Sequence, residues 1–172
     1  MHYFIRRIIF TIVLIILIQI LAVAQVKRGD WLIKKFKNAD TILLVSHALV
    51  EGSTDSQVDI SGKIVPYPKL LINKRPNKEI IKEQIMLRGE IVDSLLKILI
   101  RPYFDSVIQQ GCMLAHHAIF IIKNDKVSFI NIAFNCGSYE TSKDLEKMEP
   151  FDKQKWADLE SLFKQLGFKY GF

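Results

Sequence analysis

Two cysteines and a pair of adjacent histidines are the residues of this chain whose types and spacing could carry chemistry. Cys112 and Cys136 are the only cysteines, and His116 and His117 lie between them. In an oxidising compartment the two thiols are expected to form a structural disulfide. Thiolate and imidazole groups also bind zinc and copper, so Cys112, His116 and Cys136 are a candidate metal site. We favour the disulfide, because adjacent histidines on a strand point to opposite faces and no fourth ligand is evident.

A strand–turn–strand pattern between the cysteines determines how they face each other. Two β-rich runs flank the sequence Lys-Asn-Asp-Lys and predict a hairpin over 115–134. A three-residue loop pairs Ile122 with Lys126, and the same register places Cys112 opposite Cys136. A two-residue Asn-Asp turn would instead send the cysteines to opposite sides. The first register is favoured because it gathers one apolar face, made of Leu114, Ala118, Phe120, Ile130, Ile132 and Phe134.

Histidine side chains are the candidates for acid–base chemistry. In the favoured register His116 lies on the apolar face as a core or rim residue, and His117 faces the other way, across from Asn131. If the protein is an enzyme, His117 is therefore the candidate catalytic residue. Ser46 and His47 are adjacent in a predicted strand, where side chains diverge, which disfavours a catalytic triad there.

Motifs that would indicate a particular enzyme class are missing from the sequence. It contains no dinucleotide-binding glycine pattern, P-loop, zinc-protease helix, nucleophile elbow or Cys-x-x-Cys pair. We therefore expect no cofactor, and the prediction leans away from an enzyme.

Residues 1–24 have the composition of an export signal. Arg6 and Arg7 precede an almost wholly aliphatic run, and small residues at the end of the segment match the sites that a signal peptidase reads. Cleavage is expected between Ala24 and Gln25. The sequence therefore predicts a signal peptide.

The same segment also fits a signal anchor. The apolar run 8–24 contains 17 residues, the short limit for a spanning helix, and uncleaved it would anchor the protein to the inner membrane. Both interpretations place residues 25–172 outside the cytoplasm, in the periplasm or at the cell surface.

The pattern of residues 25–172 predicts a single α+β domain, long enough to bury a core. We expect an antiparallel sheet of roughly four to five strands with two main helices packed on one face. The main helices are predicted at 89–100 and from the N-cap Asp152 to Gly167. Other segments are predicted as strands or hairpin (40–50, 58–65, 69–73, 80–87, 115–134), a short helix (141–147), and a helix or irregular lead-in (25–39).

Charge gives little indication of a nucleic-acid partner. The net charge is +6, but basic residues alternate with acidic ones, and the densest basic spot, residues 34–37, is short. We interpret that spot as a solvated face, not as a nucleic-acid or lipid patch. The expected partners are another envelope protein or a small ligand, with no nucleic acid and with membrane contact only through an uncleaved leader.

The segment 112–137 resembles a group of small uncharacterised exported proteins of Bacteroidetes-type bacteria. Their pattern has a Cys, a His-Ala step, a strand, a turn and a strand that ends in Cys, followed by a helix ending in Leu-Gly-Phe. Cys112, His117 and Cys136 match this pattern. Ala133 departs from it, where the pattern has a further cysteine, which weighs against a metal site built on three cysteines. The resemblance implies export and fold class, and no activity.

Three functions remain open from the sequence. The favoured one is a non-enzymatic periplasmic or surface module with a structural or binding role. The alternatives are a hydrolase with a site around His117, and a metal-binding or redox protein that uses Cys112, Cys136 and a histidine.

Overall fold

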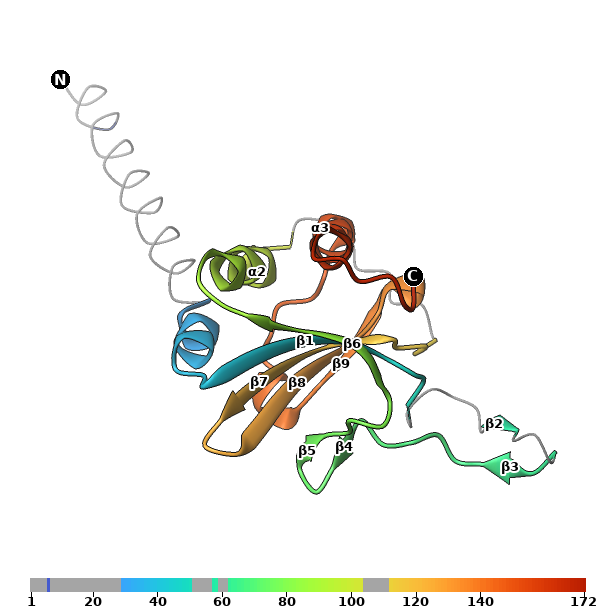
Figure 1. Cartoon of the computed structure of the whole chain (residues 1–172). Helices are drawn as coiled ribbons and strands as arrows, with labels where there is room; N and C mark the ends of the chain where they lie inside the picture. The colour runs from blue at the N-terminus through green and yellow to red at the C-terminus, as the bar shows by residue number, and fades with distance from the viewer. Residues whose placement is uncertain (1–5, 7–28, 51–56, 59–61, 104–111) are drawn as a thin grey trace.

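A computed structural model describes residues 6, 29–50, 57–58, 62–103 and 112–172 (Figure 1). Apart from Arg6, the predicted leader lies outside these residues, as does the predicted cleavage site at Ala24 and Gln25. Within the described ranges, no helix is long and apolar enough to cross a membrane. The signal-peptide and signal-anchor interpretations both stay predictions.

A five-stranded antiparallel sheet is the centre of the fold, with strand order β6-β1-β7-β8-β9. Two short hairpins, β2–β3 and β4–β5, lie outside this sheet and extend from its lower side (Figure 1). The strands of the sheet are β1 (Thr41–His47), β6 (Ile81–Leu87), β7 (His117–Lys123), β8 (Lys126–Ala133) and β9 (Ser138–Thr141). The hairpin strands are β2 (Gln57–Val58), β3 (Ile64–Val65), β4 (Leu71–Ile72) and β5 (Arg75–Pro76).

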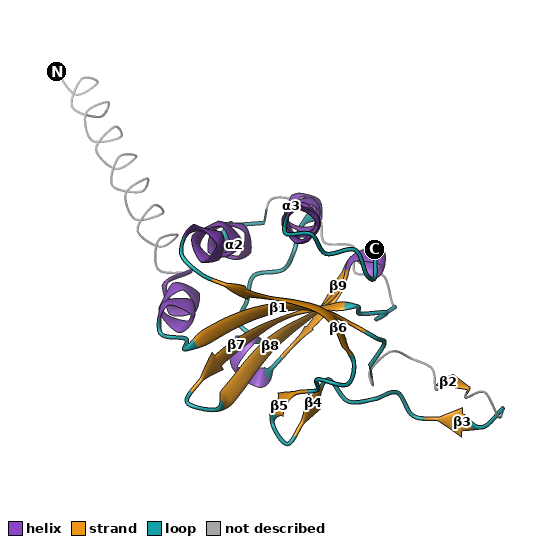
Figure 2. Cartoon of the chain, viewed as in Figure 1, coloured by secondary structure: helices purple, strands orange, loops and turns teal. Residues whose placement is uncertain are grey.

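Helices cover one face of the sheet (Figure 2). These helices are a helix over 29–37, α2 (Glu90–Ile100) and α3 (Lys153–Gln165). Two 3-10 turns are also present in the described residues, η1 (Phe134–Cys136) and η2 (Lys143–Leu145). The predicted α+β class is confirmed. The segment for which a helix or an irregular lead-in was open is helical over 29–37.

The main core lies between the sheet and the helices. Leu95, Leu96 and Leu99 of α2 are buried at the spacing that the sequence predicts. The Asp152 carboxylate accepts a hydrogen bond from the Lys155 backbone amide at 2.7 Å, as an N-cap does, and α3 begins there. Below the helices, alternate residues of the central strands close the core, among them Ile42, Leu44, Ile119, Ile121, Ile130 and Ile132.

The opposite face of the sheet has a smaller apolar cluster. Val45, Ala118 and Phe120 are buried there, and Leu70 and Leu71 from the β4–β5 side pack against them. Strands β1 and β7 are thus buried on both faces, which explains why their sequences are nearly continuous apolar runs.

The β7–β8 hairpin has the register that we did not favour. Lys123 pairs with Lys126 around a two-residue turn, and Asn124 and Asp125 have φ of 47° and 60°. A type I′ turn requires positive φ at both central residues, and Asn and Asp tolerate it. The three-residue loop is therefore wrong.

The single apolar face predicted from that loop is also wrong, because apolar residues cover both faces of the hairpin. Ile130 and Ile132 face the helices, whereas Ala118 and Phe120 face the opposite side. Leu114, predicted on the same face, is 43% exposed. The apolar pattern therefore could not distinguish the two registers, because each register gathers apolar residues on a buried face of the hairpin.

A short hairpin takes the place of the strand predicted at 58–65, which we expected to be interrupted at Ser61-Gly62. Val58 pairs with Ile64 and Gln57 with Val65, so the chain reverses between β2 and β3. Gly62 has a φ of 80°, which glycine adopts without steric cost.

Candidate functional site

The two cysteines form a disulfide, with their Cα atoms 5.7 Å apart. Neither lies in the hairpin ladder, because Cys112 precedes β7 and Cys136 is the last residue of η1. Ala115 and Ala133 are buried beside the bridge. The disulfide that the sequence predicts is confirmed, although the register from which we derived it is wrong.

Metals bind cysteine as the thiolate, so the sulfur atoms of the disulfide are not available as ligands at the candidate metal site. In the described part of the chain, no group of three or more His, Cys, Asp or Glu side chains is placed to hold a metal ion. His116, the third candidate ligand, has its Nδ1 3.2 Å from the His47 carbonyl oxygen and its ring edge-on to Tyr170.

Glu83, Ser46 and His117 form a row across β6, β1 and β7, on the face of the sheet that the helices cover. Ser46 is the register partner of both Glu83 and His117. The Ser46 hydroxyl donates a hydrogen bond to Glu83 Oε2 at 2.7 Å. His117 pairs with Ile132, so our prediction that it faces Asn131 is wrong by one residue. Sequence reasoning named His117 but not Glu83, which lies 34 residues before it in the chain.

Residues 169–172, called the 169–172 segment below, lie over this row. The backbone amides of Lys169 and Tyr170 donate to the Glu83 carboxylate at 3.1 Å. The Phe172 ring lies 4.4 Å from the His117 ring, centroid to centroid. His117 is fully buried beneath this segment.

The pKa of His117 is lowered to about 4, mainly because the ring is buried. The nearby His47 and His116 also act to lower it, whereas the Tyr170 backbone and the Glu83 carboxylate act to raise it. Burial raises the pKa of Glu83, but hydrogen bonds from Ser46, Tyr170 and Lys169 outweigh it and lower that pKa. The row thus contains a neutral imidazole and an ionised carboxylate.

The row is not arranged as a catalytic serine site. In a Ser-His site the serine hydroxyl is hydrogen-bonded to the histidine that acts as its base, whereas the Ser46 hydroxyl donates to the Glu83 carboxylate and not to His117. The hydrolase alternative around His117 therefore gains no support from this geometry.

His47 lies on the opposite face, where Asn131 also points. Its Nδ1 is 2.7 Å from the Ala48 carbonyl oxygen and its Nε2 is 3.0 Å from Asn131 Oδ1. Burial lowers the pKa of His47, although both hydrogen bonds act to raise it. These bonds satisfy a buried polar side chain and join β1 to β8, which is a structural role.

A cleft of about 630 Å³ lies between the helix over 29–37 and the β7–β8 hairpin. We call it the lysine cleft. Lysine side chains from both elements line it, together with an aromatic ring, two asparagines and one carboxylate. The lining residues are Trp31, Lys34, Lys35, Asn38, Ile121, Lys123, Asn124, Lys126, Ser128 and Asp144.

Asp144 is the single carboxylate in the lysine cleft, and it is already paired. It accepts from Lys35 Nζ at 2.5 Å and from the hydroxyls of Ser128 and Ser142 at 2.7 Å. Burial acts to raise the pKa of Asp144, but these partners lower it to about 2. The other three lysines have no carboxylate partner among the described residues, so the cleft is positively charged.

Geometry explains why two lysines of the cleft project together. Lys123 and Lys126 are register partners at the end of the β7–β8 ladder, beside the Asn-Asp turn. Like charges directly opposite each other on a ladder repel. Sequence reasoning noted Lys34 and Lys35 but assigned them to a solvated face, because nothing in the sequence links them to residues some ninety positions later.

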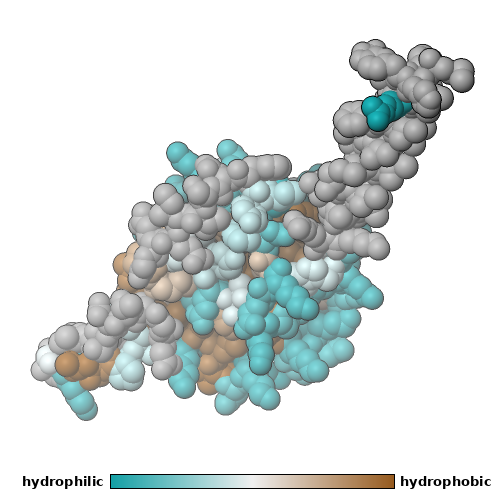
Figure 3. Space-filling view, turned by 180° about the vertical axis from the view of Figure 1, so that it is seen from behind, coloured by the Kyte–Doolittle hydropathy of each residue, from teal (hydrophilic) through white to brown (hydrophobic). Residues whose placement is uncertain are grey.

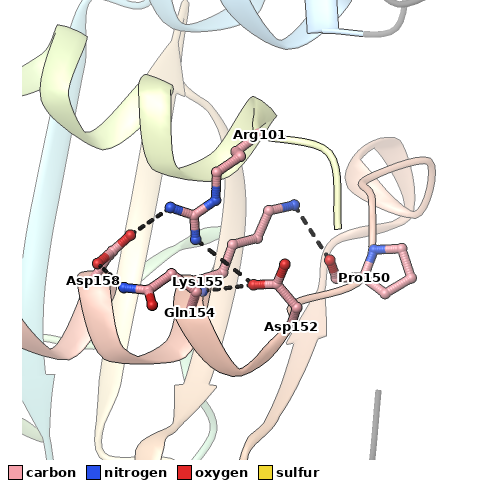
Figure 4. A network of polar contacts seen from close by, with 6 residues as sticks. All are labelled: Arg101, Pro150, Asp152, Gln154, Lys155 and Asp158. Carbon is pink, nitrogen blue, oxygen red and sulfur yellow. Dashed lines mark hydrogen bonds and ion pairs between the residues drawn. The ribbon is translucent and has the colours of Figure 1, made fainter. Parts of the chain in front are cut away.

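A separate polar network joins α2 to α3 (Figure 4). The Arg101 guanidinium donates to Asp158 at 2.5 Å and lies 3.6 Å from Asp152. Lys155 is buried, and its ammonium donates to the Pro150 carbonyl at 3.3 Å. These contacts link the end of α2 to the start of α3, and we interpret the network as structural; Arg101 Nη2, at 3.6 Å from Asp152, makes no hydrogen bond within the described residues.

Hydrophilic and apolar areas alternate on the surface seen from behind (Figure 3).

No protein-family model, curated protein or solved structure matches this chain. The resemblance to exported proteins of Bacteroidetes-type bacteria therefore stays a prediction.

Proposed function

We propose that the protein is an exported, non-enzymatic module that binds a small anionic ligand in the lysine cleft. The observation that carries the proposal is the meeting of four lysines around one cleft that contains a single carboxylate. This proposal makes the favoured binding function more specific, since it assigns a site and a class of ligand.

Charge is the first support. Lys35 is neutralised by Asp144, whereas Lys34, Lys123 and Lys126 have no carboxylate partner among the described residues. Gathering like charges costs free energy that a bound anion relieves, and a positively charged concave surface concentrates anions. A ligand with two or more negative charges, such as a phosphate ester, matches this arrangement.

Size and wall chemistry are the second support. A volume of about 630 Å³ lies within the range of small-molecule sites, which is roughly 300–1,000 Å³. Trp31 and Ile121 supply apolar contact surface beside the lysines, and Asn38, Asn124 and Ser128 supply hydrogen-bonding groups. The ligand is therefore an anion that also carries an aromatic or aliphatic part.

Export is part of the same proposal. The disulfide is compatible with an oxidising compartment outside the cytoplasm, and the sequence of residues 1–24 predicts a signal peptide or a signal anchor. A ligand would then reach the protein in the periplasm or at the cell surface.

Titration calorimetry of the full chain with phenyl phosphate tests the binding site. We expect saturable binding that weakens as salt is added, because exposed charges are screened. The variant with Lys123→Gln and Lys126→Gln should bind at least about tenfold more weakly. Benzyl alcohol, which has the ring without the charge, should not bind.

The matched control removes the same charge from elsewhere on the surface. Lys82→Gln and Lys97→Gln change two lysines that do not line the lysine cleft, and this variant should bind within about twofold of the unchanged chain. Equal losses in the two variants would mean that net charge alone attracts the probe, and an unaltered affinity in the cleft variant would place the site elsewhere. Either result would overturn the proposal.

A further inference from the structure

We infer that the lysine cleft binds the phosphate headgroups of anionic phospholipids in the membrane to which residues 8–24 anchor the chain. The inference rests on the proposed function, because it takes the same cleft and names the source of the anion. It also takes the leader as a signal anchor, which is one of the two interpretations of its sequence. The leader then holds the binding site next to its ligand.

Position along the chain is the first argument. The apolar run ends at residue 24 and the first described helix covers 29–37, so only residues 25–28 lie between them. This linker spans at most about 14 Å, because an extended chain advances roughly 3.3–3.6 Å per residue. The headgroup layer on each side of the hydrocarbon core is about 5–8 Å thick. An anchored chain therefore holds this helix, and the cleft that it lines, beside the headgroups.

Charge that follows the leader is the second argument. Residues 27–37 contain five basic residues and one acidic residue. An excess of basic residues normally marks the cytoplasmic flank of a membrane span, so this excess on the exported flank requires an explanation. Anionic headgroups attract basic residues that lie next to a span. Contact with such headgroups gives these charges a role.

The helix over 29–37 turns its apolar side to the core and its basic side to the cleft. Leu32 and Phe36 are buried in the main core, whereas Lys34 is exposed and lines the cleft. Trp31 lines the same cleft and is half-buried. Because the apolar side is already packed, the helix offers the membrane cations and an indole ring, which are residue types that lie at headgroup level.

Two more cations reach the same surface from the β7–β8 hairpin, at the end of the sheet where the first helix lies (Figure 1). Lys123 and Lys126 are exposed register partners, and both line the cleft. With Lys34 they are three cations without a carboxylate partner among the described residues. Each basic residue near an anionic bilayer strengthens binding about fivefold, so the three together favour an anionic over a neutral surface roughly a hundredfold.

The walls of the cleft match the rest of a phospholipid. Asn38 and Ser128 offer hydrogen-bonding groups to the phosphate and glycerol oxygens, and Trp31 and Ile121 offer apolar surface beside them. A phospholipid joins an anionic phosphate diester to apolar acyl chains. It is therefore an anion with an apolar part, which is the class of ligand that the cleft selects.

The test uses the full chain in lipid nanodiscs that contain a trace of lipid with a paramagnetic gadolinium chelate on its headgroup. One set of discs is phosphatidylcholine, which is neutral, and the other is an equal mixture with phosphatidylglycerol, which is anionic. The backbone amides of Lys34, Lys123 and Lys126 should relax at least about fivefold faster in the anionic discs. The amides of Lys82 and Lys97 should differ by less than about twofold between the two sets.

Two variants connect this difference to the cleft. Lys123→Gln with Lys126→Gln removes two of the three unpaired cations and should reduce the difference at Lys34 to less than about twofold. Both side chains are exposed, so the substitution removes charge without changing the core. Lys82→Gln with Lys97→Gln removes the same charge away from the cleft and should leave the difference unchanged.

Titration of phenyl phosphate onto the neutral discs separates this inference from the proposed function. Saturable phenyl phosphate binding with equal relaxation in both sets of discs would overturn the lipid inference and leave the proposed function standing. The absence of both effects would overturn both. A full difference in the variant with Lys123→Gln and Lys126→Gln, or a chain that does not co-purify with the discs, would also overturn the lipid inference.

Discussion

Ser46 and His117 are direct neighbours across the β1–β7 ladder, yet the serine hydroxyl donates to Glu83 and not to the imidazole. Residue types that could form a hydrolytic site are therefore present without the hydrogen bond that would make them one. The described residues instead form a positively charged cleft at one end of β7 and the polar row of Glu83, Ser46 and His117 at the other.

Stability should fall in acid because of His117. Its pKa is about 4 in the folded protein and 6.5 in an ordinary environment, so the unfolded chain binds the proton more readily. The stabilisation is complete above pH 6.5 and is lost as the pH falls towards 4, by about 3 kcal/mol at most. Urea unfolding across this pH range measures it.

Two substitutions separate His117 from other acid-sensitive groups. His117→Phe should flatten the pH dependence between 6.5 and 4, leaving the contribution of His47, whose pKa is also lowered. His116→Gln, at a half-buried neighbour, should leave most of the slope unchanged. An equally steep slope in the His117→Phe variant would contradict the assignment.

Gly171→Ala should destabilise the protein by about 1–3 kcal/mol, because it combines a collision with His116 and a strained φ. Gly167→Ala is the matched control, since Gly167 also has a positive φ but no atom lies within 4 Å of an added Cβ. It should cost about 1 kcal/mol. Thermal unfolding of both variants gives the comparison, and equal effects would show that Gly171 has no close approach to β7.

The two-residue turn makes a prediction of opposite sign. Asp125→Gly should raise the free energy of unfolding by about 0.5–1 kcal/mol, because glycine adopts the positive φ of 60° without steric cost. The ion pair with Arg75 that it removes is exposed on both sides and contributes little. Asp93→Gly, in the first turn of α2, should instead destabilise by about 0.5–1 kcal/mol, because glycine is a poorer helix former and a carboxylate near the helix N-terminus is lost. Destabilisation at both positions would argue against the turn.

Reducing the disulfide should lower the free energy of unfolding by about 3 kcal/mol in the chain-entropy model, for a sequence separation of 24 residues. Urea unfolding with and without reductant measures the loss. The Cys112→Ser, Cys136→Ser variant should match the reduced protein and be insensitive to reductant. A native protein whose thiols alkylate without reduction would contradict the bridge.

Sequence patterns predicted the elements of this fold better than the contacts between them. The leucines of α2 and the N-cap Asp152 carry local signals, so the two main helices begin and end close to the predicted positions. The hairpin register depended on whether Asn124 and Asp125 form the whole turn. The apolar pattern could not predict this, because β7 has apolar residues on both faces.

The candidate sites were harder to predict, because each joins distant parts of the chain. Lys34 and Lys123 line the same cleft only because the helix over 29–37 packs beside the β7–β8 hairpin. Glu83 meets Ser46 only through the β1–β6 register, and the 169–172 segment adds contacts that no short motif encodes. The cysteines were the exception, because the predicted export of the chain favours a disulfide between its two thiols.

The most direct test of the lysine cleft is a map of backbone amide NMR shifts while phenyl phosphate is added to the full chain. Binding in the cleft predicts saturable shifts concentrated at Lys34, Lys35, Lys123, Lys126 and Ser128, with no comparable change around Lys82 or Lys97. Shifts scattered over all exposed lysines, or confined to another surface, would contradict the proposed function.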